Sequence, residues 1–90
     1  MPVSPQRAFG ARVRELRLAA GMTQDDLSER CGLFRTYVSR IETGQANPTL
    51  TMIHALAVSL GVPVPALFGV PAVPRKAPLR TARLSRGRVG

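Results

Sequence analysis

Four glycines, at positions 21, 32, 44 and 61, divide this 90-residue chain up to Gly61 into short segments with the features of helices. Glycine often follows the last residue of a helix, because it adopts the left-handed conformation that ends one. The stops at positions 21, 32, 44 and 61 predict helices over residues 6–20, 24–31, 35–43 and 50–60, with a short fifth helix at 65–68. No segment keeps the period-two alternation of a strand. We therefore expect an all-α, compact five-helix bundle.

The starts of two of these helices also carry clear signals. Thr23 and Thr49 precede apolar periodic segments, and a threonine hydroxyl at this position accepts a hydrogen bond from a free amide of the first turn. Asp25 and Asp26 follow Thr23, where negative charge favours the positive end of the helix dipole. The two helices are therefore expected to begin directly after their threonines.

The segment 35–43 separates its side chains into two faces. On a helical wheel, the apolar Phe34, Val38 and Ile41 lie within roughly 60° of one another. The polar side chains spread over roughly 140° on the other side; they are Arg35, Thr36, Ser39 and Arg40. One face is expected in the core, while the other offers two guanidinium groups and two hydroxyls to a partner.

Charge and composition divide the chain into one domain and a basic tail. Residues 1–70 carry 7 arginines against all 5 acidic residues, whereas residues 71–90 carry 6 basic residues and no acid. We expect a flexible N-terminus at 1–5, a domain at 6–70 and a disordered basic tail at 71–90. Such a tail favours polyanionic partners, with nucleic acid first and an anionic membrane second.

Several functional classes are disfavoured by composition. One cysteine and one histidine offer no metal site, cofactor site or catalytic set, so we expect no enzyme and no small-molecule ligand.

Cys31 makes no intrachain disulfide, which favours a reducing, cytoplasmic setting. It is expected to be a half-buried apolar residue, with a redox-sensing thiol as the alternative. Prolines 63, 65 and 71 interrupt the one long apolar stretch, which argues against a membrane span.

The run MTQDDLSERCGLFRTYVSRIETGQANPTL, followed by IHALAVSLGVPVPALF, resembles the Cro and phage-repressor type of helix-turn-helix family over about residues 7–69. The shared features are the glutamine after the cap, the Leu and Gly of the turn, the Ile-Glu-x-Gly that ends the third helix, and the Asn-Pro loop. The resemblance implies a bacterial or phage regulator that is associated with the nucleoid and places residues 35–43 in the major groove of double-stranded DNA.

The resemblance also implies a role for individual residues. Base contacts are expected from Phe34, Arg35, Thr36 and Arg40. Phosphate contacts are expected from Gln24, Tyr37, Ser39, Gln45, Ala46, Asn47 and Thr49, including the backbone amides of the last four. Arg17 and Glu42 match a structural ion pair of the family.

Phe34 departs from the family, whose members often have a capping residue at this position. It is expected either to close the core, which we favour, or to contact a thymine methyl group. Arg7, Arg12 and Arg14 are expected to be solvated or, for some of them, to reach phosphate. The basic tail is expected to be an arm that tracks phosphates or a solvated extension.

A single domain reads only a few base pairs, so a homodimer on a two-fold operator is expected. Candidates for its interface are Val62, Val64, Leu67, Phe68 and Val70. The stretch GLFRTYVSRIETGQANPTLTMIH is especially similar to controller proteins of restriction-modification systems. A phage-type repressor and an antitoxin that binds a toxin and regulates its own operon remain open as alternatives.

Overall fold

The computed structural model describes residues 4–69, which form four α-helices and one 3₁₀ helix. The elements are α1 (Pro5–Ala19), α2 (Gln24–Cys31), α3 (Arg35–Glu42), α4 (Leu50–Leu60) and η1 (Val64–Phe68). The predicted all-α class is confirmed, and the described residues contain no strand. The expected fifth helix is present only as a 3₁₀ turn, so the five-helix count is not confirmed. Pro63, Pro65 and the left-handed Gly69 leave too few backbone donors and too short a segment for an α-helix.

The helix ends lie close to the positions that their capping residues predict. Gly32 and Gly61 adopt φ of 74° and 71° after α2 and α4, as the glycine stops require. Helix α1 begins one residue before the expected start, because the hydroxyl of Ser4 accepts a hydrogen bond of 3.1 Å from the Arg7 amide and Pro5 occupies the first turn. Ser4 and Pro5 therefore belong to the start of this helix and not to the flexible N-terminus expected at 1–5.

Every helix contributes side chains to one apolar core. The buried apolar residues are Phe9, Val13, Leu27, Val38, Ile41, Leu56, Ala57, Leu60, Ala66 and Leu67. Helix α3 packs against α1 and α2, helix α4 packs against α2, and η1 packs against α1 and α4. None of the described helices has the length and hydropathy needed to cross a membrane.

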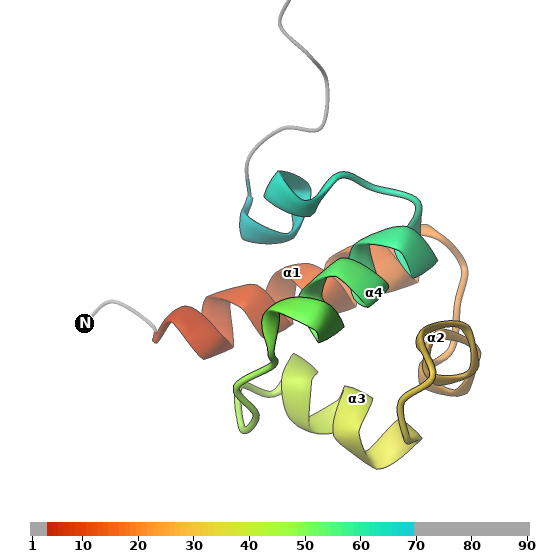
Figure 1. Cartoon of the computed structure of the whole chain (residues 1–90), viewed down its shortest axis with the longest axis horizontal. Helices are drawn as coiled ribbons and strands as arrows, with labels where there is room; N and C mark the ends of the chain where they lie inside the picture. The colour runs from red at the N-terminus through yellow and green to blue at the C-terminus, as the bar shows by residue number, and fades with distance from the viewer. Residues whose placement is uncertain (1–3, 70–90) are drawn as a thin grey trace, which may run out of the picture.

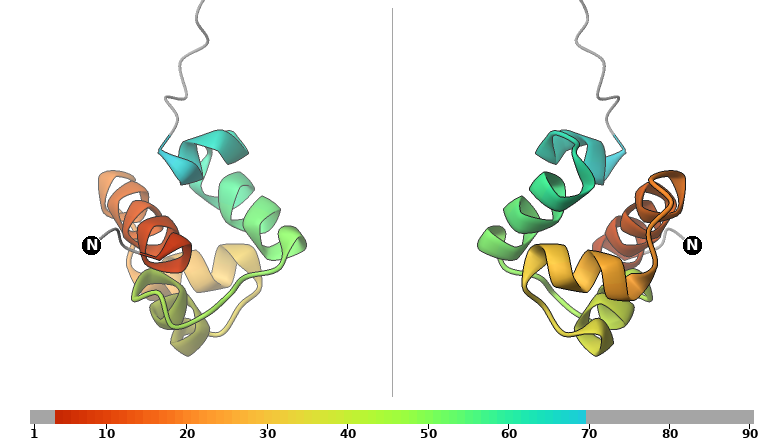
Figure 2. Two further views of the ribbon diagram at one scale, coloured as in Figure 1. Left: turned by 90° about the vertical axis from the view of Figure 1, so that its left-hand side faces the viewer. Right: turned by 90° about the vertical axis from the view of Figure 1, so that its right-hand side faces the viewer.

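This packing places α3 and η1 on opposite sides of the bundle. Helix α3 runs along one edge, η1 lies at the other, and α1 and α4 lie between them (Figures 1 and 2). The described chain ends at Gly69, next to η1 and away from α3. The basic tail and residues 1–3 lie outside the described residues.

The start of α2 carries a reciprocal pair of caps. The hydroxyl of Thr23 accepts a 3.0 Å hydrogen bond from the Asp26 amide, and the Asp26 carboxylate accepts a 2.9 Å bond from the Thr23 amide. This bond from the Thr23 backbone is the main reason that the pKa of Asp26 lies below its ordinary value of 3.8, and the Thr23 hydroxyl lowers it further. The ionised carboxylate therefore stabilises the fold.

Replacing Asp26 by alanine is expected to lower the melting temperature at neutral pH. The pKa of Asp26 is depressed in the folded state, so its stabilisation is present above pH 3.8 and is lost as the pH falls through the folded-state pKa. The difference in melting temperature between wild type and Asp26→Ala should therefore shrink below pH 3.8. Thermal melts followed by circular dichroism across this range check it, with Glu29→Ala on the exposed side of the same helix as the control. A difference that stays constant with pH would contradict the assignment.

Candidate nucleic-acid interface

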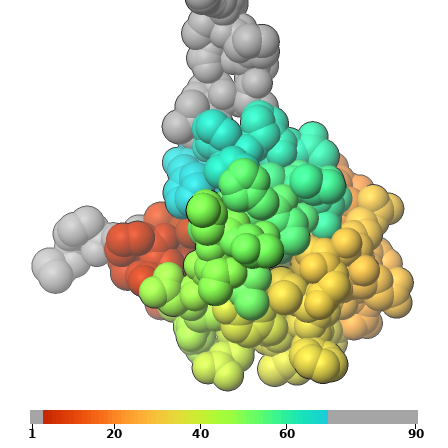
Figure 3. Space-filling view, in the orientation of Figure 1, coloured from red at the N-terminus to blue at the C-terminus, as the bar shows by residue number. Residues whose placement is uncertain are grey.

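Helix α3 turns its apolar side into the bundle and its basic side to solvent. Val38 and Ile41 are fully buried against α1 and α2. Arg35, Thr36 and Arg40 are exposed on the same two turns. In the space-filling view, α3 forms the lower rim of the molecule (Figure 3). The structure therefore presents the two arginines and a hydroxyl together on a projecting helix.

The start of α3 differs from the expectation for Phe34. The predicted burial of this ring is wrong, because Phe34 is 85% exposed. It occupies the N-cap position with extended backbone and makes no side-chain cap, while the preceding Leu33 packs against the core instead. Successive side chains of an extended segment point to opposite sides. Of Leu33 and Phe34, only Leu33 therefore reaches the core.

Arg35 has a partner that the sequence analysis did not foresee. Its Nε lies 3.4 Å from Oδ1 of Asp25, and both side chains are largely exposed. The sequence pattern places Asp25 only at the positive end of the α2 dipole, and no spacing rule predicts a pair between the first turns of two different helices. An exposed pair of this kind contributes little to stability, so it orients Arg35 without holding it rigidly.

A buried polar network connects three helices behind the exposed face. The guanidinium of Arg17 donates to Glu42 through Nε at 2.6 Å and through a terminal nitrogen at 3.1 Å. Its other terminal nitrogen donates to the carbonyl of Met22 at 2.8 Å. The Gln24 amide donates to the same carboxylate at 3.1 Å. Glu42 thus holds the end of α3 against α1 and the start of α2, and one amide hydrogen of Gln24 is already used inside the protein.

The loop between α3 and α4 offers fewer free donors than expected. The backbone amide of Gln45 donates to the Arg40 carbonyl at 2.8 Å, so the structure does not leave this amide free for the expected phosphate contact. The Gln45 side chain and Asn47 are exposed, whereas Ala46 packs against the core. The Thr49 hydroxyl accepts from the Met52 amide at 3.2 Å and caps α4. Of the four backbone amides expected to contact phosphate, the structure engages the one of Gln45 inside the protein.

Two further polar residues of α3 are only partly accessible. Tyr37 is half-buried and packs against the core cluster. Ser39 is also half-buried. Both lie on α3, beside the exposed arginines, so a contact with a backbone phosphate at the edge of a groove is compatible with their placement.

A family model described as a helix-turn-helix domain matches residues 8–68, which span α1 to η1. The chain belongs to the helix-turn-helix family. This confirms the resemblance that the glutamine, the glycine turn and the Asn-Pro loop indicated. The helix-turn-helix itself is formed by α2 and α3, the second of which projects from the bundle.

The relatives of this helix-turn-helix protein include controller proteins. The chain is 44% identical over 55 residues to the control protein C.BamHI of Bacillus amyloliquefaciens, covering 60% of this chain and 68% of that protein. The crystal structure of the restriction-modification controller C.AhdI from Aeromonas hydrophila matches with a TM-score of 0.69 and 43% identity, over 70% of this chain and 96% of that one. The controller C.Esp1396I, solved as a tetramer on its natural 35-base-pair operator, matches with a TM-score of 0.68 and 29% identity, over 76% and 90% of the two chains.

The side of the molecule away from α3 carries exposed apolar surface. Leu67 was one of the residues expected in a dimer interface. That expectation is wrong, because Leu67 is fully buried in the monomer core. Val62 and Val64 are half-buried against the same core, and Val70 lies outside the described residues. Phe68 is 57% exposed, with its ring 5.1 Å from that of Phe9. A 3₁₀ turn points successive residues in different directions, so Leu67 faces inward and Phe68 outward.

Val58 is an exposed apolar residue that the sequence analysis missed, at 81% exposure on α4. A signal for it existed, because Val58 lies outside the stripe formed by Leu56, Ala57 and Leu60 at 100° per residue. A large apolar side chain off the buried stripe of a helix marks a candidate contact surface.

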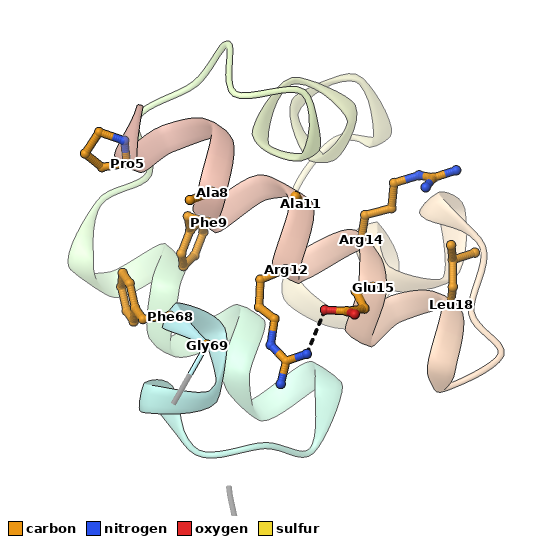
Figure 4. A pocket seen from close by; sticks show the side chains of 10 residues that line it. All are labelled: Pro5, Ala8, Phe9, Ala11, Arg12, Arg14, Glu15, Leu18, Phe68 and Gly69. Atoms are coloured by element: carbon orange, nitrogen blue, oxygen red, sulfur yellow. Dashed lines mark hydrogen bonds and ion pairs between the residues drawn. The ribbon is translucent and has the colours of Figure 1, made fainter. Parts of the chain in front are cut away.

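One hollow of the described surface lies between α1 and η1, away from α3. It has a volume of about 690 Å³ and is open to solvent. In Figure 4 the rings of Phe9 and Phe68 lie at one end and the Arg12–Glu15 ion pair lies beside them. Arg12 also donates to the Ala66 carbonyl at 2.8 Å. Arg12, one of three arginines expected to be solvated or to reach phosphate, is partly buried and has its guanidinium engaged on the side of η1.

Proposed function

We propose that this chain is a sequence-specific transcriptional regulator that binds double-stranded DNA with α3 in the major groove. The observation that carries the proposal is the projecting basic face of α3, with Arg35, Thr36 and Arg40 exposed above a buried Val38 and Ile41. Two guanidinium groups on one helix are suited to the O6 and N7 acceptors of guanine. The tight packing of α3 against α1 and α2 keeps this face outward.

The surrounding residues fit phosphate contacts on both sides of such a helix. At the start of α2, the free hydrogen of the Gln24 amide and the backbone donors of a helix N-terminus favour an anion. Beyond α3, the exposed side chains of Gln45 and Asn47 and the start of α4 at Thr49 form a second candidate patch. Tyr37 and Ser39 are proposed to lie against the backbone between the two.

We also propose that the protein acts as a homodimer on a two-fold operator in the cytoplasm. Two recognition helices about 34 Å apart would reach successive major grooves. Val58, Phe68 and the half-buried Val62 and Val64 supply apolar surface away from α3. Because the named relatives are controller proteins, one of them solved on its operator, we place the chain in the control of a restriction-modification system. The basic tail is a further candidate for phosphate contact.

Selection of bound sequences from random duplex DNA tests this function. Arg35→Ala is expected to relax the base preference at one or two positions by about 1–3 kcal/mol, because a guanidinium reads guanine directly. Gln24→Ala is expected to weaken binding to selected and random DNA by the same factor, because a phosphate contact carries no base information. Equal losses on selected and random DNA for Arg35→Ala would contradict base reading by this residue.

Sedimentation of the complex checks the oligomeric state in the same experiment. Two chains for each selected two-fold site are expected. A single chain on a selected site without two-fold symmetry would contradict the dimer while leaving base reading by α3 intact.

A further inference from the structure

The most unusual residue on the DNA-facing side is a phenylalanine fully presented to solvent. Phe34 is 85% exposed at the first position of the helix-turn-helix recognition element. A serine, threonine or asparagine would stabilise the helix here, and Phe34 makes no cap at all. Since its ring supports neither the cap nor the core, stability does not explain its presence.

The surroundings of Phe34 define the chemistry that would contact it. Arg35 and Thr36 follow it directly, Arg40 lies one turn further along the exposed face, and all three are exposed. A partner of this surface must be anionic and must also offer an apolar group to the ring. Duplex DNA meets both conditions in the major groove, where the only apolar group on a base edge is a methyl at C5 of a pyrimidine.

The neighbouring ion pair limits how Arg35 is presented beside the ring. Asp25 faces the Nε edge of the guanidinium at 3.4 Å. The end of the guanidinium, where each terminal nitrogen has one hydrogen pointing outward, then offers a fork suited to O6 and N7 of guanine. Because Phe34 and Arg35 are adjacent in the chain, the bases that they contact are expected to be neighbours in the DNA.

We propose that Phe34 is a specificity-determining residue that packs against the C5-methyl group of a pyrimidine next to the guanine bound by Arg35. This inference rests on the proposed function. Two bases carry such a methyl group in duplex DNA, thymine and 5-methylcytosine. Binding of this protein would then respond to methylation of cytosine at that position as well as to the choice of thymine.

The experiment compares duplexes that differ by a single methyl group. In the sequence selected by the wild-type protein, the pyrimidine beside the guanine of one half-site is made thymine, uracil, 5-methylcytosine or cytosine. A buried methyl-sized group contributes about 0.8 kcal/mol, so each methylated base should bind about fourfold more tightly than its unmethylated counterpart. The tighter of thymine and 5-methylcytosine identifies the natural source of the methyl group. Fluorescence anisotropy at fixed salt measures the ratios.

Two variants of Phe34 assign the effect to the ring. Phe34→Ala should bring both ratios close to one. Phe34→Ser should also bring both ratios close to one. It should raise the melting temperature by about 4–8 °C, because serine supplies the missing cap. A more stable variant that has lost the methyl preference shows that the loss does not come from unfolding. Leu18→Ala removes another exposed apolar side chain, on α1, and should keep the wild-type ratios.

Three results would overturn the inference. One is a selected sequence with no pyrimidine beside the guanine that depends on Arg35. Another is a wild-type ratio near one in both pairs of duplexes. The third is an unchanged ratio in Phe34→Ala. In each of these cases selective DNA binding itself persists, so the failure differs from that of the proposed function, in which no sequence is selected at all.

Discussion

Replacing Glu42 by alanine is expected to lower the free energy of unfolding by about 3–5 kcal/mol. The carboxylate accepts two hydrogen bonds from Arg17 and one from Gln24, and both charged residues are buried. Without it, the Arg17 guanidinium remains in the interior with only the Met22 carbonyl as a partner. A buried, unpaired charge is among the most costly changes that a fold can suffer. Urea denaturation followed by circular dichroism measures the loss.

The double variant Arg17→Met/Glu42→Leu provides the control for this loss. It removes both charges and fills the space with apolar side chains, and it is expected to recover most of the stability. Gln24→Ala, which removes only one hydrogen bond, should cost about 1 kcal/mol. A loss below about 1 kcal/mol for Glu42→Ala would show that water satisfies Arg17 and that the network does not hold the helices together.

Replacing Gly10 by alanine is expected to destabilise the protein by about 3 kcal/mol, the upper end of the usual cost of overpacking. Gly10 lies buried in α1, where the helix crosses the end of α3. A methyl group at this position would lie 2.8 Å from the carbonyl oxygen of Glu42 and closer still to that of Ile41. Both are backbone atoms, so relief requires α1 and α3 to move apart. Thermal denaturation measures the effect.

The neighbouring Ala11 supplies a matched control. It is exposed on the same turn of α1, and Ala11→Gly should cost only the helix propensity of about 0.5–1 kcal/mol. In an ordinary helix position, the change from glycine to alanine is stabilising by the same amount. A stabilising Gly10→Ala would therefore show that α1 and α3 do not approach as closely as the structure has them.

The close approach of α1 and α3 also connects stability to DNA binding. Gly10 and the Arg17–Glu42 pair both act at the contact between these helices, beneath the exposed arginines of α3. Variants that loosen this contact are therefore expected to weaken DNA binding through the position of α3 and not through lost base contacts.

Much of the fold followed from local signals. Thr23, Gly32, Thr49 and Gly61 end or begin helices through bonds and backbone angles that involve only a few neighbouring residues, and the structure has each of them in that role. Ser4 was the exception: its cap of α1 was not predicted, although a serine followed by proline is a common start of a helix.

The site was predictable only to the extent that it follows helical periodicity. The two faces of α3 came from the spacing of Val38 and Ile41, and the arginines lie opposite them. Phe34 and Leu67 were misplaced because each stands at the edge of an element, where periodicity no longer decides the direction of a side chain. Three polar groups were not placed correctly because their partners lie elsewhere in the fold. Arg12 donates to η1, Asp25 pairs with α3, and the backbone amide of Gln45 donates to Arg40 within a tight turn.

Local patterns were sufficient to predict most helix ends, the apolar side of each helix and the helix that carries the basic face, because these properties depend on contacts within a few residues. Which polar groups are already engaged, and which apolar side chains remain in solvent, became clear from the packing of the helices. Those outcomes depend on how α1, α3 and η1 meet, and segments far apart in the chain meet through packing that no local pattern specifies.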